Sequence, residues 1–243
     1  MKNKYKTARI IKVEQETSVV NNYILDIKLK SKPGQYVMVW IPGQNEKPFS
    51  LADGNPLTLS IAKVGPFTEK IHKLKVGDDL SFRGPYGKSF ELKGKRILMI
   101  GGGYGTVPLY YLASKVPLRL RKNVYVIIGA RTKASLPFVA KFKAIGCNVM
   151  TTTDDGSTGF PVFTTELAQV LLRKKRIDSV YTCGPEIMMK KIAEFCSRKK
   201  VFCQVSMEKY FKCGGLGLCG ECSCKGKLVC IDGPVFNGKF LVE

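Results

Sequence analysis

Five cysteines lie within eighteen residues near the C-terminus, at Cys213, Cys219, Cys222, Cys224 and Cys230. Thiolates packed this densely can share one metal centre, and the glycines between them let the backbone wrap a cluster and direct amides at sulfur. Five residues and then two separate the first three of these cysteines, close to the four and two of the plant-type iron–sulfur pattern. The spacing therefore predicts a 2Fe-2S cluster, with Cys213, Cys219, Cys222 and Cys230 as its ligands.

Other uses of these thiols have to be weighed against a cluster. A structural zinc site also takes four cysteines, usually as two CxxC pairs, whereas this chain has one such pair, Cys219 and Cys222. Disulfides or unliganded thiols are the remaining alternatives. Cys224 is left over by the spacing, either as a spare buried thiol or as a substitute ligand.

Length and composition limit the class of protein. The chain has 243 residues, enough for two modest domains and a small appendage, and 44% of them are hydrophobic, which supports a well-formed core. No uninterrupted apolar run approaches eighteen residues, and none follows the basic N-terminus, so we expect neither a membrane span nor a signal peptide. Nine cysteines without an export signal indicate a reducing compartment, and hence a cytoplasmic protein.

The formal net charge of +21 allows two interpretations. One is nucleic-acid binding, and the other is a solvated, lysine-rich surface that faces an acidic partner or suits a hot environment. The cations are scattered, and the densest runs, 118–122 and 173–176, fall between predicted elements, so we favour the solvated surface and expect no nucleic-acid partner. The single histidine, His72, is predicted to be structural, and no catalytic acid or base is expected.

The chain changes character twice. Residues 1–92 contain short alternating strands separated by turn signals, typical of a small antiparallel β-barrel. Residues 93–200 alternate strands with helices, which predicts a parallel α/β sheet, and 201–243 form a short cysteine-rich module, too small to hold a core without its metal. The strands are expected at 7–13, 22–29, 35–41, 57–63, 79–83, 96–100, 124–129, 148–152 and 178–182, and the helices at 107–114, 137–145, 164–172 and 185–198.

Two glycine motifs follow strands of the predicted α/β sheet. Gly101, Gly103 and Gly105 allow a tight turn and a close approach of phosphates to a helix N-terminus, although the full GxGxxG pattern is not met. Cys183-Gly-Pro185 ends the strand at 178–182 and opens a helix. Its cysteine could face a nicotinamide at the carboxyl edge of the sheet, or it could be a small buried residue before a helix start.

A third motif, Lys47-Pro-Phe-Ser50, lies in the barrel region. It offers a cation, an apolar wall and a hydroxyl along an extended segment, which could hold an isoalloxazine ring and a pyrophosphate. Taken alone it would be a turn and a strand.

Together, these motifs carry a family resemblance. Over nearly its full length the chain resembles the ferredoxin–NADP⁺ reductase superfamily, and within it the family of electron-transfer subunits of dihydroorotate dehydrogenase B. It departs from the family's motifs at Lys47, where an arginine is usual, and in the five residues between its first two cluster cysteines. The resemblance lies in segments 47–50, 101–109, 129–133, 153–159, 183–185 and 230–236.

The resemblance implies FAD, NAD and a 2Fe-2S cluster as cofactors. It also implies an FMN-containing catalytic partner that oxidises dihydroorotate. Electrons would pass through the cluster and FAD to NAD⁺, within a heterotetramer of pyrimidine biosynthesis. The implied FAD contacts are Lys47, Pro48, Phe49, Ser50, Ile61, Ala62, Lys63, Phe67 and Thr68; those for NAD are Gly101, Gly102, Gly103, Gly105, Cys183, Gly184 and Pro185.

 The site that oxidises dihydroorotate is thus expected on the partner subunit, and this chain is expected to exchange electrons with NAD⁺/NADH.

Two rival functions remain open from the residues alone. A flavin and iron–sulfur subunit of another redox complex, of the hydrogenase or sulfite reductase type, would share the barrel, the glycine loop and a cysteine motif. A basic, zinc-bearing module that binds nucleic acid belongs to a different class. The absorption spectrum separates the second from the first, because flavin and cluster are coloured and zinc is not.

Overall fold

The computed structural model describes residues 4–242 and groups the chain into two compact units. The first, here called the barrel unit, runs to Ser89 and includes Glu208–Pro234. The second, the sheet unit, comprises Phe90–Met207 and the residues from Val235 onward. Each unit has its own core, and each is described by itself.

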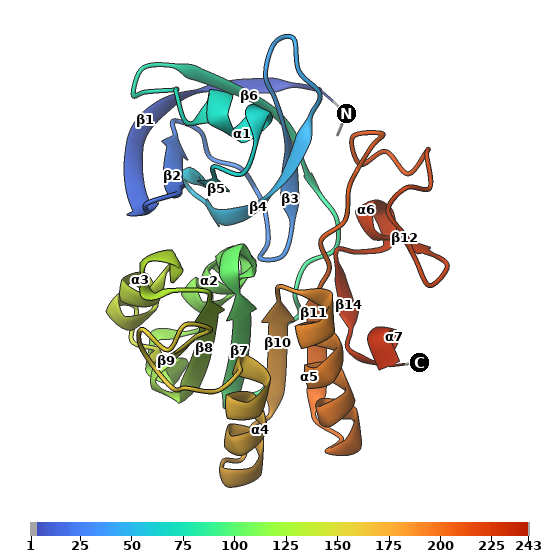
Figure 1. The fold of residues 1–243 in the computed structure, drawn as a ribbon. Helices are drawn as coiled ribbons and strands as arrows, with labels where there is room; N and C mark the ends of the chain where they lie inside the picture. The colour runs from blue at the N-terminus through green and yellow to red at the C-terminus, as the bar shows by residue number, and fades with distance from the viewer. Residues whose placement is uncertain (1–3, 243) are drawn as a thin grey trace. The chain divides into compact units, whose positions relative to one another are not determined.

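The barrel unit is built on a closed six-stranded barrel in the order β1-β2-β5-β4-β3-β6 (Figure 1). Neighbouring strands are antiparallel, and in β5 every second side chain is buried, as expected of a strand with one face on a core. The short helix α1 (Pro66–Ile71) follows β5. The strands are β1 (Lys6–Thr17), β2 (Val20–Leu25), β3 (Tyr36–Trp40), β4 (Lys47–Gly54), β5 (Leu57–Ala62) and β6 (Asp79–Tyr86).

The cysteine-rich segment, residues 208–234, has little regular structure. Two short strands, β12 (Ser223–Cys224) and β13 (Lys227–Leu228), form a hairpin, and a single helical turn, α6 (Val229–Asp232), follows it. The segment packs with the barrel in one compact unit. After Pro234 the chain enters the sheet unit through β14 (Val235–Asn237) and ends in α7 (Lys239–Val242).

The sheet unit contains a six-stranded sheet in the order β14-β11-β10-β7-β8-β9. All neighbours are parallel except β14, which runs antiparallel to β11. The residues Ile97, Leu98, Met99 and Ile100 are all fully buried, which explains the uninterrupted apolar run of a parallel strand covered on both faces. The remaining strands and helices are β7 (Ile97–Gly102), β8 (Val124–Ala130), β9 (Asn148–Thr153), β10 (Ser179–Cys183), β11 (Phe202–Ser206), α2 (Thr106–Ser114), α3 (Val139–Ala144), α4 (Thr164–Lys174) and α5 (Glu186–Arg198), with 3₁₀ turns η1 (Gly103–Gly105), η2 (Leu118–Asn123) and η3 (Lys133–Ser135).

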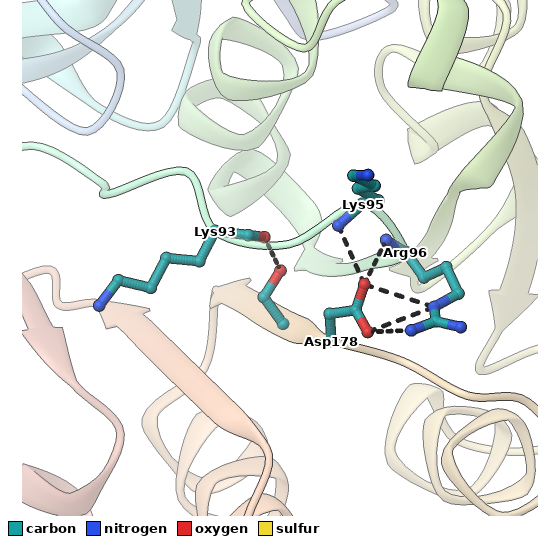
Figure 2. Close-up of polar contacts among 5 residues, drawn as sticks. Lys93, Lys95, Arg96 and Asp178 are labelled. Atoms are coloured by element: carbon teal, nitrogen blue, oxygen red, sulfur yellow. Dashed lines mark hydrogen bonds and ion pairs between the residues drawn. The ribbon is translucent and has the colours of Figure 1, made fainter.

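One ion pair fixes the starts of two neighbouring strands of this sheet (Figure 2). The Asp178 carboxylate pairs with the Arg96 guanidinium, with Nη2 and Oδ1 2.5 Å apart. The same carboxylate accepts the backbone amides of Lys95 at 2.9 Å and Arg96 at 3.0 Å. The Ser179 hydroxyl donates to the Lys93 carbonyl at 2.7 Å, so the entry to β7 is held against the entry to β10 by side chains.

The predicted fold class is confirmed: a closed barrel, a mainly parallel sheet and a C-terminal cysteine-rich segment. The differences are local. The strand expected at 22–29 ends at Leu25, and the helix expected at 137–145 begins only after Phe138, whose φ of 63° lies in the left-handed region. Helix α1 and strands β11 and β14 were not predicted.

The predicted division into domains of 1–92, 93–200 and 201–243 stays a prediction. In the structure, the residues Phe202–Ser206 of the expected cysteine module form β11, because they pair in register with β10. None of the helices within residues 4–242 is both long enough and apolar enough to cross a bilayer.

Candidate cofactor sites

The two glycine motifs of the sheet unit lie next to each other. Strands β7 and β10 are parallel neighbours, and Cys183 at the end of β10 pairs in register with Gly101 near the end of β7. The chain passes from β7 to β8 and β9 on one side, and β10 and β11 lie on the other, so the topology switches between β7 and β10. Open α/β sheets bind their ligands at the carboxyl edge beside such a switch point.

The glycines of these motifs have different roles. A Cβ on Gly105 would lie 2.5 Å from the Cys183 carbonyl carbon, and one on Gly102 would lie 2.6 Å from Cδ of Pro185, so both positions need glycine for the turns to pack together. Gly103 has a φ of 53° and no heavy atom within 4 Å of where its Cβ would be. The loop thus presents an open, positive-φ backbone position above a tightly packed base, which fits a dinucleotide phosphate.

Two buried hydroxyls lie at this edge and were not singled out from the sequence. Thr106, at the start of α2, and Thr182, at the end of β10, are fully buried, and their Oγ1 atoms have no hydrogen-bond partner within the described residues. A Cβ on Gly101 would lie 2.6 Å from the Thr106 Oγ1. Buried hydroxyls without partners are uncommon, so these two hydroxyls beside the glycine loop remain able to hydrogen-bond a polar ligand.

Cys183 does not present its side chain to solvent. Its relative exposure is 0%, whereas Pro185 two residues later is exposed. This burial agrees with the alternative interpretation of Cys183 as a small buried residue before a helix start. Its expected contact with a nicotinamide stays a prediction.

The predicted flavin residues come from three consecutive elements of the barrel unit. Lys47, Pro48, Phe49 and Ser50 open β4, Ile61 and Ala62 end the neighbouring β5, and Lys63 follows directly. Phe67 and Thr68 lie in α1. The rings of Phe49 and Phe67 are stacked, with centroids 6.3 Å apart and an interplanar angle of 20°. The fold therefore brings the first and last parts of the predicted set together.

Two members of this set already have partners in the protein. The Lys47 ammonium lies 4.7 Å from the centroid of the Tyr210 ring, a cation–π contact with the cysteine-rich segment. The Thr68 hydroxyl accepts the backbone amide of Val64 at 2.9 Å and donates to the Gly65 carbonyl at 3.0 Å. Thr68 thus shapes the loop ahead of α1, and the contact of Lys47 with flavin phosphates stays a prediction.

The thiols of the predicted cluster ligands interact in pairs. The Sγ atoms of Cys222 and Cys230 lie 3.2 Å apart and are buried. Cys213 accepts hydrogen bonds from the Cys219 thiol and from backbone amides of the loop between them, and Cys230 accepts the amide of Gly217. Amides directed at sulfur are what a thiolate-bound cluster needs, so the donor set fits a 2Fe-2S group.

The first and last of these cysteines have opposite electrostatic surroundings. Burial disfavours the Cys213 thiolate, but amides of Leu218 and Cys219 outweigh it and lower the pKa of Cys213 to about 6. Burial and the neighbouring Cys222 raise the pKa of Cys230 to about 12. One end of the segment is therefore prepared to hold a thiolate, and the other holds it readily only beside a positive charge such as iron.

Cys224 stands apart from these pairs, in the hairpin strand β12. Within residues 4–242 no three cysteine, histidine or carboxylate side chains are arranged to hold a metal ion as they stand. The four-ligand set therefore stays a prediction, supported by the sulfur pairs and the amides around them.

Comparisons with known proteins agree with this arrangement. Residues 208–242 match the model of the iron–sulfur cluster binding domain of dihydroorotate dehydrogenase B. Proteins of Methanocaldococcus jannaschii and Pyrococcus furiosus, each named as a dihydroorotate dehydrogenase B (NAD⁺) electron transfer subunit, are 42% and 43% identical to this chain. Each match covers 97% of this chain, and 91% and 92% of the respective relatives.

Solved structures share the fold. A structure of an NADH-dependent reduced ferredoxin–NADP oxidoreductase, described for flavin-based electron bifurcation, is 28% identical with a TM-score of 0.80, over 96% of this chain and 88% of that one. The ferredoxin reductase of carbazole 1,9a-dioxygenase has a TM-score of 0.68 at 21% identity, over 82% of this chain and 66% of that one, and shows the fold alone.

The fold and the sites define an oxidoreductase of the FAD- and NAD-binding ferredoxin reductase class with an added iron–sulfur domain. The two relatives from Methanocaldococcus jannaschii and Pyrococcus furiosus are matched over almost their whole length and identify the family within this class. The chain belongs to the family of electron-transfer subunits of dihydroorotate dehydrogenase B. The family name, electron transfer subunit, implies a catalytic partner subunit.

Proposed function

We propose that this chain carries electrons from an FMN-containing, dihydroorotate-oxidising partner subunit to NAD⁺, as a step of pyrimidine biosynthesis. Bound flavin can exchange single electrons with an iron–sulfur cluster and a hydride with nicotinamide. The residues proposed to hold the cluster are Cys213, Cys219, Cys222 and Cys230. FAD is assigned to Lys47–Ser50, Ile61–Lys63, Phe67 and Thr68, and NAD to Gly101–Gly103, Gly105 and Cys183–Pro185.

One observation carries this proposal. The proposed flavin strand and the cysteine-rich segment belong to the same compact unit and share contacts. Tyr36 pairs in register with Ser50 across β3 and β4, and its hydroxyl donates to the Cys230 carbonyl at 3.0 Å. A single tyrosine therefore connects the two proposed cofactor sites, so their separation is fixed within the barrel unit.

The proposed assembly is a heterotetramer in the cytoplasm, without membrane or nucleic-acid partners. The family name supports a catalytic partner subunit. Nine cysteines in a chain of 243 residues suit a reducing compartment, where thiols stay available to a metal centre. The scattered cations, with a net charge of +21, would favour docking to an acidic partner over a long range at low salt.

The decisive experiment combines the holoprotein with the candidate partner subunit and measures dihydroorotate-dependent reduction of NAD⁺. The pair should form NADH, whereas the isolated chain should only oxidise NADH with artificial acceptors. Steady NADH formation from dihydroorotate by the isolated chain would place the substrate site here and overturn the proposal. A colourless, zinc-containing protein would overturn it as well.

A further inference from the structure

A buried arginine of the barrel contacts the cysteine-rich segment. Arg83, on β6, has a side chain that is 6% exposed, and its partner Glu46 is 12% exposed. Its Nε donates to Glu46 Oε1 at 2.6 Å, and its Nη1 donates to the Tyr86 hydroxyl at 2.9 Å. Its Nη2 donates to Glu46 and, at 2.5 Å, to the carbonyl of Gly214, the residue after Cys213. The guanidinium thus joins a barrel carboxylate to the backbone of the cysteine segment.

The two glycines after Cys213 are fitted against these barrel side chains. Gly214 and Gly215 have φ values of 69° and 79°, a region that disfavours side chains. A Cβ on Gly214 would collide with the Arg83 guanidinium and the Glu46 carboxylate, and one on Gly215 would lie 2.8 Å from the Tyr36 hydroxyl. The turn therefore needs glycine at both positions, because the barrel side chains leave no room for a Cβ.

The other end of the segment is held in a similar way. The Tyr36 hydroxyl donates to the carbonyl of Cys230, and the Tyr36 ring contacts Phe211 with centroids 5.0 Å apart. In a trans peptide the C=O and the following N–H point in opposite directions. Fixing the Gly214 carbonyl on Arg83 therefore also fixes the direction of the Gly215 amide, away from the arginine.

We propose that Arg83 is a positioning residue for the iron–sulfur cluster, whose charge, balanced by Glu46, sets how readily the cluster accepts an electron. The inference rests on the proposed ligand set. Cluster potentials depend on net charge and hydrogen bonding around the sulfurs. A reduced cluster carries one more negative charge, so a nearby cation favours reduction and a nearby carboxylate disfavours it. Arg83 and Glu46 act in opposite directions on the same loop.

Opposite charges predict opposite shifts. In Glu46→Gln the guanidinium is left uncompensated, and the midpoint potential should rise. In Arg83→Gln the cation is lost, and the potential should fall. If the pair only stabilised the fold, the two variants would not shift the midpoint potential in opposite directions. Changes in the surroundings of metal ligands commonly weaken binding, so we expect Arg83→Gln also to lower cluster retention roughly tenfold.

The test uses the full-length holoprotein and follows the cluster by electron paramagnetic resonance during a redox titration, with iron content and thermal unfolding measured in parallel. Arg96→Gln is the matched control, because it breaks an arginine–carboxylate pair of the sheet unit in which guanidinium and carboxylate are also hydrogen-bonded. It should lower the unfolding temperature and leave the potential unchanged.

Arg83→Lys is a second variant that tests the inference if Arg83→Gln does not fold. Lysine keeps the charge but lacks the planar fork, so its potential should stay near that of the unchanged protein while cluster retention falls. Unchanged potentials in Glu46→Gln and Arg83→Gln, or shifts of the same sign, would overturn the inference. If the unchanged protein holds no 2Fe-2S cluster, the proposed function fails instead, and the two failures are told apart by that signal.

Discussion

The parallel sheet and the cysteine-rich segment obtain their shapes in different ways. Strands β7, β8 and β10 pair in register, and most of their apolar side chains are buried. In the segment 208–234 the longest regular element is the four-residue α6, and Gly214, Gly215, Gly217 and Gly220 all have positive φ. Burial of its own side chains stabilises the sheet, whereas the segment depends on side chains of the barrel and on its proposed cluster.

Two arginine–carboxylate pairs, one in each unit, show the same contrast. Arg96 and Asp178 have side chains that are 36% and 23% exposed, and they hold the entries of two strands that already pair with each other (Figure 2). Arg83 and Glu46 are more buried, and Arg83 donates to a backbone carbonyl 131 residues away in the chain. The first pair adds to a structure that burial already determines, and the second helps to define a loop.

The largest expected effect comes from removing the cluster ligands. Changing Cys213, Cys219, Cys222 or Cys230 singly to serine should abolish the cluster signal in reduced electron paramagnetic resonance. Amide hydrogen exchange should then speed up in the segment but stay slow in β7 and β10. Cys224→Ser is the matched control and should keep the signal.

If amide exchange in β7 and β10 speeds up together with exchange in the segment, the sheet is not stabilised independently of the cluster. The ligand assignment is wrong if Cys224→Ser loses the cluster while Cys219→Ser or Cys222→Ser keeps it. Both outcomes are read from the same set of variants.

A pair of glycine substitutions separates strain from collision. Gly214→Ala and Gly220→Ala both place a side chain at positive φ, which costs about 1–2 kcal/mol. Only Gly214 has the arginine and glutamate in the way, so overpacking should add about 1–3 kcal/mol there. Denaturant unfolding and iron content measure the difference, and equal losses in the two variants would contradict close packing against the barrel.

The ion pair of the sheet unit predicts a pH dependence. The Arg96 guanidinium and the amides of Lys95 and Arg96 hold the pKa of Asp178 below its ordinary value. The unfolded chain therefore takes up the proton first, so the stabilisation is complete above the usual carboxyl pKa of about 4 and is lost as the pH falls below it. Asp178→Asn should cost about 1–3 kcal/mol at neutral pH and flatten this acid limb.

Unfolding measured between neutral and acid pH checks this sign. Asp154→Asn is a suitable control, because Asp154 is an exposed carboxylate of the same unit that lies outside the Arg96–Asp178 pair. An acid limb that is as steep in Asp178→Asn as in the unchanged protein would show that the pair does not stabilise the sheet.

The smallest effect is expected at the flavin strand. Ser50→Ala should weaken FAD retention roughly two- to tenfold, since one hydroxyl hydrogen bond contributes about 0.5–1.5 kcal/mol net. Ser81→Ala removes a hydroxyl from another barrel strand, where it bonds Thr7 at 2.8 Å, and should leave retention unchanged. Equal flavin loss in both variants, or FMN in place of FAD, would contradict the assignment.

Elements that depend on local pattern were predicted well. The buried strand expected at 96–100 is observed as Ile97–Gly102, and the helix expected at 164–172 as Thr164–Lys174. Hydrophobic periodicity decides such elements within a few residues of chain. The missed strands β11 and β14 lie within the range expected to form only a cysteine-rich module, and their place depends on pairing with β10 and with each other.

The sequence by itself determined the spacing of the cysteines, the glycine loops and the Lys47-Pro-Phe-Ser50 motif, because each is a run of neighbouring residues whose chemistry is set by their order. Only the tertiary structure placed Arg83, paired with Glu46, on the Gly214 carbonyl across 131 residues of chain, and Tyr36 on the Cys230 carbonyl across 194. Such contacts depend on how the barrel closes and on where the returning segment packs. The proposed ligand set therefore follows from spacing in the sequence, while the contacts proposed to position it could be found only in the folded chain.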